Sequence, residues 1–88
     1  MGLDTMEMLL SVEDTFDMEM PEKDAQALRT VGDIIRYVQI HISSGGGRAI
    51  WSDQEIDSKI RSIISQNQGI PIDRLKDEAR LVEDLGME

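Results

Sequence analysis

The sequence predicts an all-α fold, a small four-helix bundle made of three main helices and one short helix. Three stretches place apolar residues at the spacing of a single helix face, and two of them follow a capping-box pair, which is a sequence signal for a helix start. No stretch alternates apolar and polar residues over the length of a strand. With 88 residues, the chain is long enough for one small domain and not for two.

The first main helix is predicted near the N-terminus. Five residues there fall at i, i+3, i+4, i+7 and i+11: Thr5, Met8, Leu9, Val12 and Phe16. Pro21 is expected to stop this helix, because the residue before a proline avoids helical geometry. Pro21 can then open a short helical turn over residues 23–28. Thr30 and Asp33 have capping-box spacing, and the helix that they start would bury Val31, Ile34, Ile35 and Val38.

A linker rich in serine and glycine, residues 43–50, divides the chain. Its three consecutive glycines cannot hold a helix and are typical of a flexible connection. We therefore expect residues 1–42 and residues 51–88 to be two helical blocks of one domain.

The second block is predicted to begin with Ser52 and Glu55, again at capping-box spacing. The helix behind them has an apolar stripe of Ile56, Ile60, Ile63 and Ile64. Gly69 should end it, and Pro71 should prevent its resumption. An ordered loop is expected at residues 70–77, anchored by Ile70, Ile72 and Leu75, with one further helical turn within residues 78–85.

The charge and composition of the chain exclude several functions. The formal net charge is −9, which repels nucleic-acid phosphates and anionic membranes and favours basic patches on other proteins. The alternative is that the charge serves solubility alone. No apolar run approaches the about 20 residues of a membrane span. There is no cysteine and a single histidine, His41, so neither a thiolate nor a multi-histidine metal site is expected, and a reducing, cytoplasmic compartment is favoured.

The first helix carries more apolar residues than a core face needs. Leu3, Met6 and Leu10 lie beside the core stripe at i, i+3 and i+7, and four acidic residues surround them: Asp4, Glu7, Glu13 and Asp14. An apolar stripe rimmed by charge of one sign is typical of an interaction surface. The alternative is a broad core face with solvated acids beside it. We predict neither a catalytic nor a metal site there, although dense carboxylates attract hard cations weakly.

Several segments resemble acyl carrier proteins. Residues 3–21 are similar to the second helix of that family, which follows the modified serine, and residues 22–37 are similar to its short third helix and its last helix. Residues 56–88 resemble the beginning of the family and end in Val82-Glu83-Asp84-Leu85-Gly86-Met87-Glu88. The family's second half thus precedes its first half, as in a circular permutant.

The resemblance also places the break. In the family a Glu-Asp-Leu-Gly run leads into the serine that carries 4′-phosphopantetheine. If the ends of this chain are imagined as joined, so that Leu3 follows Glu88 as in the family, that position falls at Gly2. Glycine has no hydroxyl to modify. We therefore expect this chain to carry no phosphopantetheine itself. The missing serine and the glycine linker suggest an engineered molecule; a fragment of tandem carriers is the alternative.

The resemblance implies a role in fatty-acid, polyketide or specialised lipid synthesis, as a carrier and not as an enzyme. Basic patches of acyl-transfer and synthase enzymes would dock on the extra stripe and its acids: Leu3, Asp4, Met6, Glu7, Leu10, Glu13 and Asp14. The acyl chain would lie among Thr5, Met8, Leu9, Val12, Phe16, Ile34 and Val38. Two alternatives stay open, a protein for folding or assembly that forms a domain-swapped homodimer, and an unrelated acidic helical interaction module.

Overall fold

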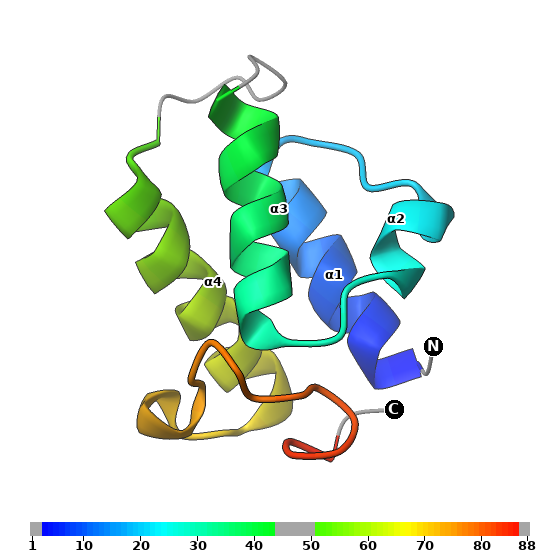
Figure 1. Cartoon of the computed structure of the whole chain (residues 1–88), viewed down its shortest axis with the longest axis vertical. Helices are drawn as coiled ribbons and strands as arrows, with labels where there is room; N and C mark the ends of the chain where they lie inside the picture. The colour runs from blue at the N-terminus through cyan, green and yellow to red at the C-terminus, as the bar shows by residue number, and fades with distance from the viewer. Residues whose placement is uncertain (1–2, 44–50, 87–88) are drawn as a thin grey trace.

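The computed structural model describes residues 3–43 and 51–86, with side chains from Thr5 onward. It contains four α-helices, α1 (Leu3–Phe16), α2 (Glu22–Gln26), α3 (Val31–Ser43) and α4 (Asp53–Gln68), and a short 3-10 helix, η1 (Ile72–Arg74) (Figure 1). Within these two ranges there is no strand, only one isolated bridge between Thr30 and Arg80. The predicted all-α bundle of three long helices and one short helix is confirmed.

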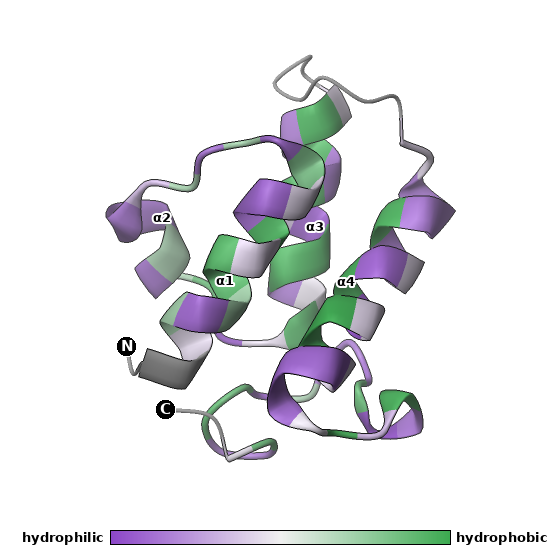
Figure 2. Cartoon of the chain, turned by 180° about the vertical axis from the view of Figure 1, so that it is seen from behind, coloured by the Kyte–Doolittle hydropathy of each residue, from purple (hydrophilic) through white to green (hydrophobic). Residues whose placement is uncertain are grey.

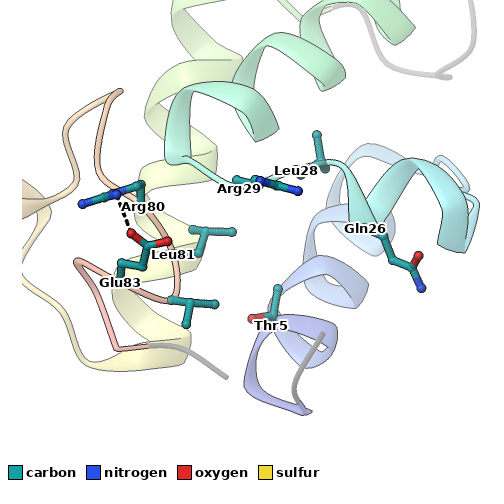
Figure 3. A pocket seen from close by; sticks show the side chains of 8 residues that line it. Thr5, Gln26, Leu28, Arg29, Arg80, Leu81 and Glu83 are labelled. Atoms are coloured by element: carbon teal, nitrogen blue, oxygen red, sulfur yellow. Dashed lines mark ion pairs between the residues drawn. The ribbon is translucent and has the colours of Figure 1, made fainter.

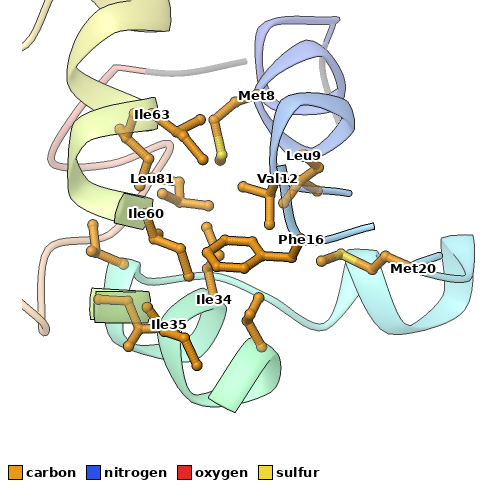
Figure 4. Packing of buried hydrophobic residues seen from close by; sticks show 14 of the residues in the cluster. Met8, Leu9, Val12, Phe16, Met20, Ile34, Ile35, Ile60, Ile63 and Leu81 are labelled. Atoms are coloured by element: carbon orange, nitrogen blue, oxygen red, sulfur yellow. The ribbon is translucent and has the colours of Figure 1, made fainter. Parts of the chain in front are cut away.

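One apolar core is shared by both blocks of the chain. Helices α1 and α3 both pack against α4, and in Figure 4 the side chains of Met8 and Phe16 lie opposite those of Ile60 and Ile63. The apolar stripe predicted for each long helix is buried: Thr5, Met8, Leu9, Val12 and Phe16 on α1, Val31, Ile34, Ile35 and Val38 on α3, and Ile56, Ile60, Ile63 and Ile64 on α4.

The predicted helix caps are also confirmed. Ser52 and Glu55 exchange hydrogen bonds, with the Glu55 amide donating to Ser52 Oγ and the Ser52 amide donating to Glu55 Oε1, both at 3.1 Å. Thr30 and Asp33 form the same pair at the start of α3. Gly69 closes α4 with φ 65°, a left-handed conformation that glycine adopts without strain.

Helix α1 ends earlier than Pro21 predicts. It stops at Phe16 because Asp17 takes a positive φ of 50°, and the Met18 amide then donates to the Glu13 carbonyl at 3.0 Å. An aspartate tolerates this left-handed conformation better than most residues do. The chain therefore leaves the helix before the proline can act, and Pro21 instead precedes α2 as its N-cap.

The segment after α4 differs from expectation in two places. Leu75 is buried as predicted, and Ile70 packs against the core, but Ile72 is 53% exposed and is no anchor. Ile72 is the first residue of η1, and in this single turn its side chain faces outward. Residues 78–85 contain hydrogen-bonded turns and no helix, because Asp84 and Leu85 both donate to the Arg80 carbonyl, which gives irregular spacing.

This last segment is held by the start of α3. The first amides of any helix lack partners within the helix. Here the Val31 amide donates to the Ala79 carbonyl at 3.0 Å, and the Gly32 amide donates to the Asp77 carbonyl at 2.9 Å. The Leu81 amide donates back to the Arg29 carbonyl at 2.8 Å. As a result, residues 77–81 lie against α3 although they have no regular structure of their own.

Arg61 of α4 fastens the same segment from the other side. Its Nε lies 2.6 Å from Asp57 Oδ1 one helical turn away, and its guanidinium also donates to the Leu75 carbonyl and to Asp77. Hydrogen bonding to Asp57 raises the pKa of Arg61, so the charge persists at any ordinary pH. Helix α4, η1 and the Asp77 turn are thereby joined.

Replacing Gly32 with alanine should destabilise the fold, because an added Cβ would lie 2.9 Å from the Asp77 carbonyl oxygen. Overpacking costs about 1–3 kcal/mol, and alanine favours a helix by about 1 kcal/mol over glycine, so we expect a net loss of up to about 2 kcal/mol. Urea denaturation measures this difference, with Arg36→Ala, an exposed change on the same helix, as control. A Gly32→Ala variant as stable as the native chain would contradict the close contact.

Candidate functional site

The outward side of α1 carries apolar and acidic residues together. Met6 and Leu10 are 50% and 60% exposed, and Glu7 and Asp14 are exposed beside them. Figure 2 shows hydrophilic and hydrophobic residues mixed along this helix. We call Met6, Glu7, Leu10 and Asp14 the acidic face of α1. The side chains of Leu3 and Asp4, which were predicted to belong to it, lie outside the described part of the chain.

A groove runs between this face and the short helix α2. Its volume is about 260 Å³. We call it the α1–α2 groove, and it is lined by Met6, Leu9, Leu10, Glu13, Met20, Glu22, Ala25 and Gln26. The floor is apolar, while Glu13 and Glu22 put negative charge at its edges. Sequence patterns missed the contribution of α2 and of the loop before it, because Ala25 and Met20 reach α1 only after the chain has turned back at Asp17.

Glu13 has a structural contact in addition to its place at the groove. Its side chain is half-buried, and Oε2 accepts a hydrogen bond from the Met20 amide at 2.8 Å. This contact holds the loop between α1 and α2 in place. The role of Glu13 in binding a partner stays a prediction, but part of its hydrogen-bonding capacity is already used within the chain.

A second hollow, of about 690 Å³, lies at the C-terminal end of α1. We call it the His41 depression, and it is lined by Leu10, Glu13, Asp14, Asp17, Met18, Glu19 and His41. Sequence analysis did not assign Asp17, Glu19 or His41 to a site. Among the described residues, no three carboxylate or histidine side chains are placed to hold a metal ion.

A third hollow lies where the start of α1 faces the last described segment (Figure 3). We call it the Thr5 cavity. It has a volume of about 810 Å³ and is lined by Thr5, Gln26, Leu28, Arg29, Arg80, Leu81, Val82 and Glu83. Thr5 and Leu81 are far apart in the sequence, and the hydrogen bonds at the start of α3 bring them to one place. Val82 is apolar and yet 62% exposed at this cavity.

Arg80 is engaged on the outer side of the cavity. It forms ion pairs with Glu83 and with Asp84, the latter at 3.3 Å. Asp84 also accepts the Arg80 amide, and these hydrogen bonds hold the pKa of the Asp84 carboxyl below its usual value. The three charges cap the turn at residues 80–84. In Figure 3 the Arg80 side chain points away from the space between Leu81 and Thr5.

The residues predicted for an acyl pocket lie in two kinds of environment. Thr5 lines the Thr5 cavity and Leu9 lines the α1–α2 groove. The other five are packed in the core with no exposed surface: Met8, Val12, Phe16, Ile34 and Val38. An acyl chain among these five would have to displace packed side chains, so their role stays a prediction. The wall of the Thr5 cavity opposite α1 includes Val82 and Glu83. The sequence signal for this wall was the resemblance of the run that begins at Val82 to acyl carrier proteins.

Tyr37 of α3 links the short helix to the bundle. Its hydroxyl donates to Asp24 Oδ2 at 2.7 Å. Burial, this hydrogen bond and the negative charges of Asp24 and Glu13 raise the pKa of Tyr37 to about 12. Because α2 contributes Gln26 to both the groove and the Thr5 cavity, the Tyr37–Asp24 bond helps to position a wall that the two share.

Together these features define a class, a small all-α bundle with an acidic, partly apolar helix face and hollows on both sides of a short helix. Known proteins narrow the class. The chain is 49% identical over 40 residues to the acyl carrier protein of Chlamydia trachomatis serovar L2, which is 46% of this chain and 52% of that protein. It is 38% identical over 40 residues, with the same shares, to the acyl carrier protein of Clostridium acetobutylicum.

A third acyl carrier protein, from Chlamydia felis, is 49% identical over 38 residues, 43% of this chain and 49% of that protein. The chain thus spans about half the length of the curated relatives that it matches. No family model matches it, and no solved structure gives a significant match. In the described part of the chain, no helix is both long enough and apolar enough to cross a membrane.

Removing the Asp24 charge should lower the pKa of Tyr37 from about 12 toward 10.0. The folded chain holds the phenol proton more tightly than the unfolded chain, so this group stabilises the fold fully below pH 10.0 and loses that effect as the pH rises to about 12. Tyr37 is the only tyrosine, so the absorbance of its phenolate reports the titration directly. Asp24→Asn is the test variant, and Asp73→Asn, at an exposed position, is the control. If the Tyr37 titration curves of these two variants are equal, the contribution of Asp24 to the raised pKa is contradicted.

Proposed function

We propose that this chain is an acyl-carrier scaffold of lipid or polyketide synthesis in which the two halves of the carrier are in permuted order. One observation carries the proposal: the start of α1 and residues 80–83 line the same cavity. These segments resemble the two sides of the carrier's attachment serine, and they meet in space although they lie at opposite ends of the chain (Figure 1). The identity of 38–49% to acyl carrier proteins supports the same reading.

In this proposal the acidic face of α1 is the docking surface for acyl-transfer and synthase enzymes. Met6 and Leu10 would contact an apolar patch, while Glu7 and Asp14 would pair with lysine or arginine side chains around it. The carrier presents cargo and performs no catalysis. A cytoplasmic location, among such soluble enzymes, belongs to the same proposal.

The residues present do not fit covalent attachment of phosphopantetheine. Gly2, at the proposed attachment position, has no hydroxyl and lies outside the described residues. The hydroxyl of Thr5 is the one on the cavity wall, but the residue is only 3% exposed, so a transferase could not reach it. Ser11 donates to the Glu7 carbonyl within α1. This chain is therefore expected to carry no phosphopantetheine.

A second candidate is a domain-swapped homodimer. The core supports it, because α1 and α3 of the first block both pack on α4 of the second. Two chains that exchange their second blocks, with the connection between α3 and α4 as the crossover, would keep all of these contacts.

The carrier proposal is tested by a rejoined variant in which residues 51–88, a serine and residues 3–43 follow in that order. After incubation with coenzyme A and a broad-specificity phosphopantetheinyl transferase, intact mass should show one phosphopantetheine on this variant and none on the native chain. An otherwise identical variant with alanine in place of the serine is the control. A rejoined variant that is helical by circular dichroism but accepts no phosphopantetheine would contradict the carrier assignment.

The swapped dimer predicts a dependence on concentration. The closed monomer and the dimer share the same contacts, so both should be populated. Gel filtration of a dilution series should show a dimer fraction that falls on dilution, because association depends on chain concentration by mass action. Lengthening the linker with further glycine and serine residues should shift the distribution to the monomer. A monomer fraction independent of concentration would sink this candidate.

A further inference from the structure

The short helix η1 leaves an apolar side chain uncovered next to two cations. Ile72 exposes 53% of its surface, and Arg74 and Lys76, which follow it, are exposed as well. Neither cation forms an ion pair with a carboxylate in the described part of the chain. We call Ile72, Arg74 and Lys76 the η1 patch. Asp73 is the one acid within this stretch, so cations prevail there.

The η1 patch has the opposite character to the acidic face of α1. That face exposes two apolar side chains, Met6 and Leu10, beside the carboxylates of Glu7 and Asp14. A contact between the two surfaces would cover apolar groups on both and set two cations against two anions. Apolar contact combined with charge complementarity is how specific protein surfaces recognise each other.

The two surfaces cannot meet within one chain. The acidic face of α1 borders the groove to α2, and Figure 1 shows η1 on the opposite side of the molecule from α2. Helix η1 packs instead on α4. An occupant for either surface must therefore come from another molecule.

The net charge of the chain restricts which contact two copies can make. At −9, two copies repel each other over most of their surfaces. In about 0.15 M salt the screening length is about 8 Å, whereas the molecule measures 33 × 27 × 19 Å. Charges far from a contact are therefore screened, and the charges within it decide. A contact that sets the η1 patch on the acidic face is favourable in these terms.

We propose that the η1 patch of one chain docks on the acidic face of α1 of a second copy. Its apolar residue lies against Met6 and Leu10, and its two cations face Glu7 and Asp14. Because the two surfaces differ, the contact is head-to-tail and leaves one surface open at each end, so it can add further copies. Both surfaces are small, and the contact is accordingly weak and transient.

Self-docking would cover the surface that the proposed function assigns to partner enzymes. A second copy and an enzyme could not occupy the acidic face of α1 at once, so a high concentration of the chain would withdraw that face from enzymes. The inference goes beyond the carrier role, because the contact needs neither phosphopantetheine nor cargo.

A concentration series of the native chain tests the contact. Backbone amide resonances are followed by NMR up to about 1 mM chain in about 0.15 M salt. We expect the amides of the η1 patch and of the acidic face of α1 to shift together as concentration rises. No shift at either surface, or shifts on the acidic face alone, would overturn the proposal. A dimer without shifts at either surface would point to exchange of second blocks and would also overturn it.

Two neutralised variants test the charges. Arg74→Gln/Lys76→Gln, the cation-removed variant, and Glu7→Gln/Asp14→Asn, the acid-removed variant, should each weaken self-association about three- to tenfold, because each loses two exposed ion pairs. Removing two acids also takes the net charge from −9 to −7. Net repulsion alone would make the acid-removed variant associate more tightly, and that result would contradict the proposal.

A matched control separates the location of the cations from their number. Arg36→Gln/Lys59→Gln removes two exposed cations from α3 and α4, so its net charge equals that of the cation-removed variant. Its self-association should stay within about twofold of the native value at this salt concentration. An equal loss in the two variants would mean that net charge alone is responsible, and the proposal would fail.

Mixing the two neutralised variants gives the sharpest test. The cation-removed variant keeps an intact acidic face and the acid-removed variant keeps an intact η1 patch, so an equimolar mixture should regain one contact and stop at a pair. With the isotope label in the cation-removed variant, shifts should be confined to its acidic face. A mixture that shifts no more than either variant alone would overturn the head-to-tail arrangement.

The apolar part of the contact is tested by Ile72→Ser. This change should weaken self-association, whereas Val82→Ser, which replaces an exposed apolar residue outside both surfaces, should not. Both positions are exposed, so the fold should tolerate the changes. Unchanged self-association in Ile72→Ser would contradict the assigned contact. None of these outcomes depends on whether the rejoined variant accepts phosphopantetheine, so the two proposals can fail separately.

Discussion

Three backbone hydrogen bonds at the start of α3 hold the last segment of the chain against the helical bundle. The Val31 and Gly32 amides, which have no partner within their own helix, donate to carbonyls of the last segment, and the Leu81 amide donates back to the Arg29 carbonyl. The last segment has no regular structure from Leu75 onward, so its path depends on these bonds together with the contact of Arg61 to the Leu75 carbonyl and the turns within residues 76–86. Gly32 is essential to this contact because a side chain there would meet the Asp77 carbonyl.

The hollows of the molecule follow from that contact and from the return of the chain at Asp17. The first places Leu81 and Val82 opposite Thr5 and so creates the Thr5 cavity. The second lays α2 alongside α1 and creates the groove next to the acidic face. Both hollows share Gln26, and the hydrogen bond from Tyr37 to Asp24 ties that shared wall to α3. The proposed docking surface and the Thr5 cavity thus lie on two sides of one short helix.

Some features were predictable because they depend on residues close in sequence. The capping pairs Ser52–Glu55 and Thr30–Asp33 form over three residues, and their side chains reach no further. The exposure of Ile72, in contrast, depends on how the whole segment after α4 folds, and the prediction that Ile72 is an anchor is wrong. An isoleucine after a proline reads as an anchor, but the 3-10 turn that begins there faces it outward while Leu75 enters the core. Glu13 was read as a surface acid, whereas the fold brings the Met20 amide to it.

The sequence by itself determined the three long helices, apart from the end of α1, with their buried stripes and the acidic character of α1, because helical periodicity and caps act over one or two turns. It also determined the likeness to acyl carrier proteins, which short segments carry. Only the tertiary structure decided that Arg29, Thr5 and Val82 surround one cavity, and that Arg80 is turned away from it by Glu83 and Asp84. These neighbours come from three separate segments, and the hydrogen bonds that join the segments depend on backbone amides, which every residue type except proline provides alike.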